Sequence, residues 1–321
     1  MKYTSRVTIE ELREKYQNII AWGTGPIFTT NYSTDLFVID YLVDGTGKHV
    51  GETVKGKVVD DISVLKNLEG KSIIILYTIY ERQVVEQIKD IKQNIDLVVY
   101  GLIDTKDCGR PHVYAKNCED ILLYQLIRQF CISEIKFLEI GVCHPIMRNN
   151  TFLLHEIYSS KIGYKGVLVE ANPICWDIIE EYRPRDILIK KGVGIVNGKL
   201  PFYMFPDLLG HSTFDKQTAE EKSRKGGWKI EELKIDVVGL SEIIEENFDS
   251  TPDILAIDAE GLDYDILKNW DSQKYPFKII VSEVVDTYDV FLTLMQQKGY
   301  KPYAKTPENV IWYRDDLKIN V

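Results

Sequence analysis

The sequence lacks the features that mark secreted and membrane-spanning proteins. None of its 321 residues belongs to an apolar run near the ~20 residues needed to span a bilayer. No apolar segment follows residues 1–6, which predicts that the chain has no secretory signal. Its cysteines are odd in number and never spaced as C-x-x-C, which argues against a disulfide framework and a zinc site. We expect reduced thiols in a cytoplasmic protein. The five are Cys108, Cys118, Cys131, Cys143 and Cys175.

A surplus of basic charge is also missing. The chain has 39 Lys and Arg against 49 Asp and Glu, a net charge of −10. Proteins that bind nucleic acid normally show a basic surplus or a concentrated basic face. The densest basic run, 222–225, is short and flanked by glutamates, so we interpret it as a solvated loop. We therefore expect a small-molecule substrate and no nucleic-acid partner.

The length is sufficient for two domains of ordinary size. Strands and helices alternate in residues 1–110, which predicts a small Rossmann-like α/β domain. Its first helix opens at a capping box, Thr8-Ile9-Glu10-Glu11. The expected strands lie near 18–22, at the end of 37–45, and at 72–77 and 97–100, with a second helix over 81–91 and a loop or small hairpin over 50–57.

A second α/β domain is expected over 118–321, after a linker at 101–117. Short apolar runs alternate with helical spacing, as in a buried parallel sheet. A charged and glycine-rich segment near 205–233 is expected to be irregular. The expected strands are 135–140, 166–170, 186–190, 254–258, 278–283 and 310–313, and the expected helices are 118–131, 150–162, 173–182, 240–247 and 290–298.

Four of these strands end in a carboxylate: Glu139, Glu170, Asp258 and Glu283. Ligands of doubly wound sheets bind at the carboxyl ends of the strands. Carboxylates at the first two strand ends can bind the hydroxyls and ammonium of a nucleoside-like cofactor. The turn after Glu139 lacks G-x-G-x-x-G and so lacks a pyrophosphate cradle, which favours S-adenosylmethionine over a dinucleotide.

Four acids at one edge repel one another unless a cation lies among them. S-adenosylmethionine carries a sulfonium and an ammonium, and a divalent metal would serve similarly. If a metal is present, Asp258 and Glu283 are the expected oxygen ligands of Mg²⁺.

The second domain resembles the FkbM-type S-adenosylmethionine-dependent methyltransferases over about residues 130–315. The resemblance depends on the order of several short pieces, each weak alone. These are Phe137-Leu138-Glu139-Ile140-Gly141 with His144-Pro145, Asn149-Asn150-Thr151, Gly166-Val167-Leu168-Val169-Glu170-Ala171-Asn172-Pro173, Arg183-Pro184-Arg185-Asp186, Gly192-Val193, Ser212-Thr213-Phe214 and Asp258-Ala259-Glu260-Gly261-Leu262-Asp263. The resemblance implies a seven-stranded class I methyltransferase sheet and methyl transfer to oxygen, often on a sugar.

The same resemblance implies roles for individual residues. Glu139 and Gly141 would line the methionine end of the cofactor, and Glu170 would hold the ribose hydroxyls. The expected cofactor contacts further along are Asn172 at the rim of the adenine pocket, Gly192 and Val193 beside adenine, and Asp258, Glu260 and Gly261 near the transferred methyl group.

A sugar hydroxyl is a poor nucleophile at neutral pH and needs a base or a metal. His144 and Asp258 are the candidate bases, with Glu260 as a further catalytic candidate. His144 can equally be a hydrogen-bonded turn histidine, and His211 is a weaker alternative base. The segment 205–233 would then recognise the acceptor or act as a lid, with Ser212 and Thr213 as substrate contacts. Trp228 could stack on a sugar face or simply pack.

A glycine turn in the first domain is a second candidate binding site. Gly23 and Gly25 follow a strand, and Asp44 comes about 20 residues later. The third glycine of the nucleotide fingerprint is replaced by Phe28, so a structural role for this turn is an equal alternative. The segment resembles the small nucleotide-sugar-binding domains of bacterial surface-polysaccharide enzymes. That resemblance implies that Gly23, Gly25 and Asp44 contact a sugar nucleotide.

The leading hypothesis is an S-adenosylmethionine-dependent O-methyltransferase that acts on a nucleotide-linked sugar in capsule or lipopolysaccharide synthesis. One alternative is an NAD-dependent oxidoreductase that uses the first glycine turn. Another is a non-catalytic protein that binds sugar nucleotides. Assembly into a homo-oligomer and a need for Mg²⁺ stay open, because a single sequence does not show which surfaces or ligands come together.

Overall fold

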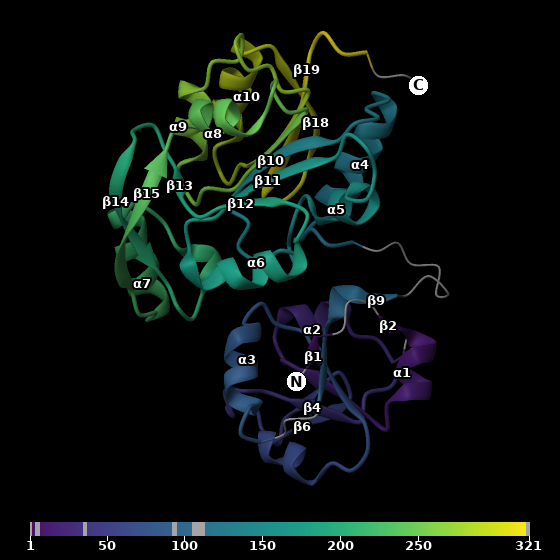
Figure 1. Ribbon diagram of the computed structural model, residues 1–321. Helices are drawn as coiled ribbons and strands as arrows, with labels where there is room; N and C mark the ends of the chain where they lie inside the picture. Colours follow the sequence, from purple (N-terminus) through teal and green to yellow (C-terminus); the bar gives the residue numbers. More distant parts are fainter. Residues whose placement is uncertain (1, 4–6, 35–36, 92–94, 105–112, 319–321) are drawn as a thin grey trace. The chain divides into compact units, whose positions relative to one another are not determined.

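The computed structural model describes residues 2–3, 7–34, 37–91, 95–104 and 113–318, and Cys108 lies outside these ranges. The chain divides into two compact units, Met1–His112 (unit 1) and Val113–Val321 (unit 2). Each unit contains an α/β sheet of its own (Figure 1).

Unit 1 has a sheet in the order β1-β8-β7-β3-β4-β6-β5, in which β5 and β6 are antiparallel and the other neighbours are parallel. The expected capping box opens its first helix: Thr8 Oγ1 accepts from the Glu11 backbone N–H (3.1 Å), and the Glu11 carboxylate accepts from that of Thr8 (3.0 Å). The elements are β1 (Lys2–Tyr3), β2 (Val7–Thr8), α1 (Ile9–Lys15), β3 (Asn18–Trp22), α2 (Pro26–Asn31), β4 (Tyr41–Val43), β5 (Thr53–Val54), β6 (Lys57–Asp60), η1 (Ile62–Asn67), β7 (Ser72–Leu76), α3 (Glu81–Ile88), β8 (Asp96–Val99), η2 (Tyr100–Leu102) and β9 (Ile103–Asp104).

Unit 2 has a seven-stranded sheet in the order β12-β11-β10-β16-β17-β19-β18. The first five strands are parallel, and β19 is antiparallel to both of its neighbours. A separate small sheet has the order β13-β15-β14. The elements are α4 (Glu119–Gln129), β10 (Lys136–Ile140), α5 (Phe152–Tyr158), β11 (Lys165–Val169), η4 (Pro173–Cys175), α6 (Trp176–Tyr182), β12 (Ile187–Ile189), β13 (Gly192–Val193), β14 (Gly198–Met204), η5 (Leu209–His211), α7 (Lys216–Gly226), β15 (Glu231–Val238), α8 (Leu240–Asn247), β16 (Ile254–Ile257), α9 (Asp263–Asn269), β17 (Ile279–Glu283), α10 (Tyr288–Gln297), β18 (Tyr300–Lys305) and β19 (Asn309–Arg314).

Two hydrophobic cores cover the two faces of the large sheet in unit 2. Because successive strand residues point to opposite faces, Leu138 packs with α8, α9 and α10, whereas Phe137 packs with α4, α5 and α6. Figure 1 shows α8, α9 and α10 grouped on one side of the strands and α4 and α5 on the other. This three-layer arrangement confirms the class I methyltransferase sheet, and it leaves the carboxyl ends of β10, β11 and β16 adjacent.

The expectation of an irregular segment over 205–233 is wrong, because this segment contains η5, α7 and the start of β15. Asp215 caps α7 by accepting from the Thr218 backbone N–H (2.6 Å), and Gly227 ends it in a left-handed conformation. Only Ala219 of α7 is buried, so the helix carries no apolar stripe that a sequence pattern would detect. The sequence also did not predict β14, because Pro201 signals a loop. The strand can contain this proline because it lies at an edge of its sheet.

The expected linker over 101–117 is only partly a connection. Its first residues form η2 and β9, and β9 pairs in parallel with β2 in unit 1. Residues 105–112 lie outside the described ranges, and the segment from Val113 onward belongs to unit 2.

Because both faces of the sheet are buried, we expect that truncating a side chain in a central strand greatly lowers the free energy of unfolding. Leu168 in β11 is fully buried, so Leu168→Ala should lower the free energy of unfolding by about 2–5 kcal/mol, through lost apolar contacts and a residual cavity. Ile187→Ala in β12 is the matched control, because Ile187 is 43% exposed. Urea unfolding followed by circular dichroism measures both. Equal costs for the two variants would contradict the two-faced core.

Candidate functional site

A cleft lies at the carboxyl ends of β10, β11 and β16 in unit 2. Its empty volume is about 620 Å³, part of which is open to solvent, and this size suits a nucleoside-like ligand. The cleft brings together nine of the residues expected to bind cofactor or substrate. They are Gly141, Glu170, Asn172, Gly192, Val193, Ser212, Thr213, Asp258 and Glu260.

Gly141 brings the first turn of the cleft against the strand beside it. Its φ is +79°, and a Cβ placed there would lie 1.7 Å from the carbonyl oxygen of Asp258. The Asp258 backbone N–H donates to the carbonyl of Ile140 (2.9 Å) and closes the same contact. Only glycine fits this approach, so the single glycine kept in this turn is required by packing.

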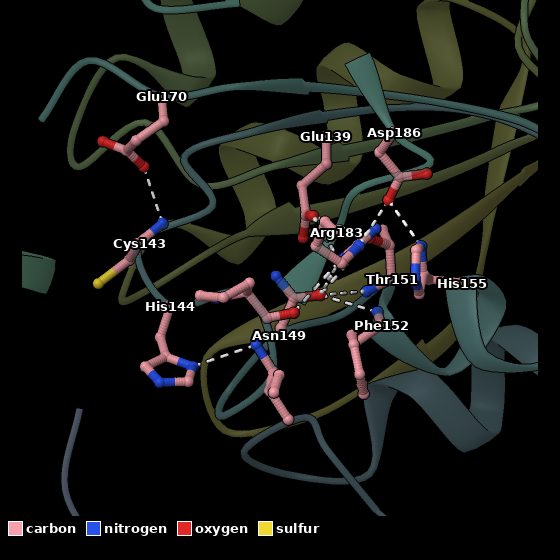
Figure 2. Close-up of polar contacts among 12 residues, drawn as sticks. Glu139, Cys143, His144, Asn149, Thr151, Phe152, His155, Glu170, Arg183 and Asp186 are labelled. Atoms are coloured by element: carbon pink, nitrogen blue, oxygen red, sulfur yellow. Dashed lines mark hydrogen bonds and ion pairs between the residues drawn. The ribbon is translucent and has the colours of Figure 1, made fainter. Parts of the chain in front are cut away.

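Glu170 organises the rim of the cleft at the end of β11. Its carboxylate accepts from the backbone N–H groups of Cys143 (2.7 Å) and Asn172 (2.6 Å), the first of which is drawn in Figure 2. Burial nevertheless raises the pKa of Glu170, because the charged form loses its hydration. A buried carboxylate fixed by two backbone donors is suited to accept hydrogen bonds from ligand hydroxyls.

Carboxylates gather at the ends of β16 and β17. Burial, followed by the charges of Glu283 and Glu260, raises the pKa of Asp258 well above its ordinary value. Burial with the charges of Glu260 and Asp263 raises the pKa of Glu283 to about 7. The buried Oδ1 of Asp258 finds no hydrogen-bond partner within the described ranges. A buried polar atom of this kind normally has a partner, so its orphaned state beside the cleft points to a ligand.

The backbone on this side of the cleft is strained. Glu260 has a φ of +48° and Cys143 a φ of +52°, which is uncommon for residues other than glycine. The carbonyl of Glu260 accepts from Thr213 Oγ1 (2.9 Å), and its carboxylate pairs with Lys222 of α7 (2.6 Å). Strain that is held in place by surrounding contacts is typical of ligand sites.

Residues 209–214 cover the cleft and are fixed by hydrogen bonds of their own. Ser212 Oγ donates to the carbonyl of Leu209 (3.1 Å) and accepts from the backbone N–H of Phe205 (3.2 Å). Trp228 packs in one cluster with Tyr203 of β14 and with Phe205, which follows β14. It meets the His211 ring edge-on, with centroids 5.7 Å apart. This environment favours the packing interpretation of Trp228.

Glu139 is buried and does not line the cleft, although we expected it to lie at the methionine end of the cofactor. Its carboxylate accepts from Thr151 Oγ1 (2.8 Å) and lies 3.9 Å from Arg183 Nη1 (Figure 2). Burial raises the pKa of Glu139, and the charge of Arg183 opposes that rise. Its observed contacts hold the loop that follows β10.

Arg183 supports the loop that follows β10, a role that the sequence did not predict. Its guanidinium is fully buried and donates to Asp186 (2.5 Å), Thr151 (3.1 Å) and Asn149 (3.3 Å). It also lies over the ring of Phe152. The Arg183-Pro184-Arg185-Asp186 motif was a signal for it, but a motif does not show that the arginine points inward.

His144 is 3% exposed and its Nδ1 accepts from the backbone N–H groups of Ile146 (3.1 Å) and Met147 (2.9 Å). An accepting Nδ1 places the ring proton on Nε2. These contacts, and its position outside the lining of the cleft, fit the turn histidine rather than a general base.

The first glycine turn belongs to unit 1. Gly23 has a φ of +109°, and a Cβ there would lie 2.9 Å from the Tyr77 carbonyl oxygen. Gly25 is the N-cap residue of α2. The Asp44 carboxylate accepts from Thr24 Oγ1 (2.6 Å) and from the Thr46 backbone N–H (2.9 Å). These contacts tie the ends of β3 and β4 together.

Metal and membrane features are absent from the described part of the chain. There, no group of three or more His, Cys, Asp or Glu side chains is arranged to hold a metal ion, Asp258 and Glu283 included. Within the same ranges, no helix has the length and apolar character needed to cross a bilayer.

The chain matches the family model described as "Methyltransferase FkbM domain" over residues 139–302. Among solved structures it is similar to a precorrin-6y C5,15-methyltransferase from Geobacter metallireducens GS-15, with 11% identity, a TM-score of 0.33 and coverage of 65% of this chain and 94% of the other. It is also similar to a TehB-like SAM-dependent methyltransferase from Corynebacterium glutamicum ATCC 13032 Kitasato, with 10% identity, a TM-score of 0.31 and coverage of 65% and 91%. No curated protein matches the chain. Because the family model spans half of the sequence and includes every strand end that lines the cleft, the chain belongs to the FkbM methyltransferase family, whose members use S-adenosylmethionine.

Proposed function

We propose that the protein is an O-methyltransferase that uses S-adenosylmethionine to methylate a hydroxyl of a nucleotide-linked sugar in capsule or lipopolysaccharide synthesis. The observation that carries this proposal is the buried, unpartnered Oδ1 of Asp258 in the same cleft as Glu170. Glu170 can then bind the cofactor while Asp258 faces the reacting atoms.

The residues of the cleft fit the parts of the cofactor. Glu170 would accept hydrogen bonds from the ribose hydroxyls, and Asn172 would border adenine together with Gly192 and Val193. Gly141 lines the cleft at the first turn, where the methionine end of the cofactor would lie. The cofactor supplies a methyl group that its sulfonium already activates, so the protein has to position the acceptor and remove its proton.

Asp258 is the proposed general base. One of its carboxylate oxygens is buried, and its raised pKa brings it closer to neutral pH, where a base is most effective. Glu260 lies beside it and pairs with Lys222. Burial raises the pKa of Glu260, and the charge of Lys222 opposes that rise. We assign the proton transfer to Asp258 and a supporting role at the acceptor to Glu260. The alternative, in which Asp258 and Glu283 hold Mg²⁺, is tested by chelation.

Ser212 and Thr213 would contact the acceptor from the segment that covers the cleft. Gly23, Gly25 and Asp44 of unit 1 would contact the nucleotide part of a sugar nucleotide. Calorimetric titration of the full chain with S-adenosylhomocysteine, and then with GDP-, UDP- and CDP-sugars, tests both halves of this proposal. The proposed function would be refuted if S-adenosylhomocysteine did not bind.

Glu170→Ala should weaken binding of S-adenosylhomocysteine by about 1.5–3 kcal/mol, because hydrogen bonds to a charged group are lost. Glu246→Ala on α8, where the side chain is exposed, is the matched control. Calorimetry measures both dissociation constants, and thermal melting shows whether each variant is folded. Unchanged affinity in a folded Glu170→Ala variant would remove the ribose site from this position.

Asp258→Asn should lower turnover by about 10²–10⁴-fold and change cofactor affinity far less, because an amide cannot accept the proton. Since the base must be ionised and burial raises its pKa, wild-type turnover should rise with pH, with an inflection above the range of ordinary aspartates. The variant should lose this inflection. Asp265→Asn, at an exposed position on α9, is the control.

The same assay with EDTA distinguishes the base from the metal. Turnover that survives EDTA and follows the expected pH profile supports Asp258 as the base. Turnover that EDTA abolishes and Mg²⁺ restores would assign Asp258 and Glu283 to a metal instead. Equal losses of turnover and of cofactor affinity in Asp258→Asn would also contradict the catalytic role.

A further inference from the structure

Three side chains that carry oxygen atoms lie on neighbouring strands, in a row that starts in the cleft and leads away from it. Asn309 of β19 lies directly opposite Glu283 of β17 in their antiparallel pair. On the other side of β17, Ile257 of β16 lies opposite Ser282. Asp258 and Glu283 are the next residues on these two strands. We call Asp258, Glu283 and Asn309 the oxygen row.

The members of the oxygen row share one face of the sheet. Ala256, Val281 and Ile311 each lie two residues from a member, and all three pack in the core that α4, α5 and α6 cover. Because strand residues alternate between faces, residues two apart share a face. The Asp258 backbone N–H still bonds to β10, so this alternation continues to the cleft. Neighbouring strands are about 5 Å apart, so adjacent members can contact one ligand.

The oxygen row contains acceptor atoms that lack donors. Asn309 is 8% exposed, and its Nδ2 donates to the Glu119 carboxylate (3.2 Å), whereas its buried Oδ1 has no partner within the described ranges. The buried Oδ1 of Asp258 is likewise unpartnered there. The Glu283 carboxylate makes no hydrogen bond or ion pair to any residue that the structure describes. Buried polar atoms normally have partners, so two orphaned oxygens beside an unpaired carboxylate indicate a ligand.

The charges of the row indicate that this ligand is cationic. Asp258 and Glu283 are carboxylates on adjacent strands, and such a pair repels unless a cation joins it. Loss of hydration, followed by the charges of neighbouring carboxylates, raises the pKa of Glu283 to about 7. Lys222 opposes that rise, but its ammonium already pairs with Glu260 (2.6 Å). A cation that satisfies the row therefore has to come from a ligand.

The row extends away from the strands assigned to the cofactor. The proposed cofactor contacts Gly141 and Glu170 follow β10 and β11, whereas β17 and β19 lie beyond β16 in the opposite direction. At the usual strand spacing, β17 and β19 are roughly 10 and 14 Å from β10. A ligand group between Glu283 and Asn309 therefore belongs to the acceptor.

We propose that the methyl acceptor is an amino sugar whose ammonium group binds between Glu283 and Asn309 while one of its hydroxyls lies at Asp258. An ammonium group has three N–H donors and no acceptor, which matches a row that offers only acceptor oxygens. A neutral hydroxyl group would leave the two carboxylate charges uncompensated. This inference rests on the proposed function and deepens it, because it names the chemical class of the acceptor.

The row also fixes where the acceptor reacts. Asp258 is the member that lines the cleft, so the methylated hydroxyl lies on a carbon close to the one that carries the amino group. The hydroxyl oxygen takes the methyl group from the sulfonium sulfur, Asp258 takes the hydroxyl proton, and S-adenosylhomocysteine is the second product.

The test is calorimetric titration of the full chain, saturated with S-adenosylhomocysteine, with D-glucosamine and D-galactosamine at neutral pH. Each amino sugar is compared with its N-acetyl form, which keeps the ring and loses the charge. The test variant is Glu283→Gln, which removes the charge and keeps the shape of the side chain. Asp286→Asn, at an exposed position three residues further on, removes the same charge and is the matched control.

We expect the wild type to bind at least one amino sugar tenfold or more tightly than its N-acetyl form. Glu283→Gln should remove this preference, whereas Asp286→Asn should keep it within twofold. Both variants should bind S-adenosylhomocysteine within twofold of the wild type. Equal binding of the amino and N-acetyl forms of both sugars would overturn the proposal, as would a preference that survives in Glu283→Gln.

Thermal melting of the protein without ligand checks that Glu283 is unpaired. Glu283→Gln removes one of two repelling charges, so its melting temperature should equal or exceed that of the wild type. A lower melting temperature would show that the fold itself satisfies Glu283, and this result would also overturn the proposal.

Two further outcomes would assign the row to another cation. A loss of S-adenosylhomocysteine binding in Glu283→Gln as large as the loss of amino-sugar binding would assign it to the ammonium of the cofactor. Binding of MgCl₂ alone that Glu283→Gln abolishes would assign it to a divalent metal. Failure of the proposed function is seen separately, since it appears as a wild-type protein that does not bind S-adenosylhomocysteine at all.

Discussion

The buried guanidinium of Arg183 is the interaction on which the functional end of unit 2 depends. It lies between two buried carboxylates, Glu139 and Asp186, and also donates to the loop that follows β10. Removing one partner of such a network leaves an uncompensated buried charge, which is far more costly than the net worth of the intact pair. The loop held in this way carries Gly141 and Cys143 into the cleft.

The charge distribution around the cleft follows one physical pattern. Carboxylates gather at or near the ends of β10, β11, β16 and β17, and loss of hydration raises the pKa of all four. Glu139 and Glu170 have partners within the fold. Asp258 keeps an oxygen atom that has none among the described residues, and a group in this state can exchange a proton with a ligand.

Much of the fold could be predicted from the sequence because the signals for it are local. A run such as Ile254–Ile257 is apolar over its whole length, and that suffices to identify a buried strand. The same reasoning failed for α7, whose residues are almost all polar and whose ends are set by Asp215 and Gly227. It also failed for β14, because a proline within a strand signals a loop unless the strand is known to lie at an edge.

The sequence by itself determined which acids lie at or near the strand ends and that a glycine follows the first of these strands. Strand ends and turns depend on neighbouring residues, so they can be recognised locally. Only the tertiary structure decided what each side chain does. Glu139 and Glu170 each close an apolar run in the sequence, yet Glu139 lies inside β10, opposite Leu168, and turns toward Arg183, whereas Glu170 follows β11 and lines the cleft. The ring of His144 likewise accepts a hydrogen bond from the backbone of its own turn. The reason is that a buried polar group is defined by its partners, and for these carboxylates the partners come from segments that are distant along the chain.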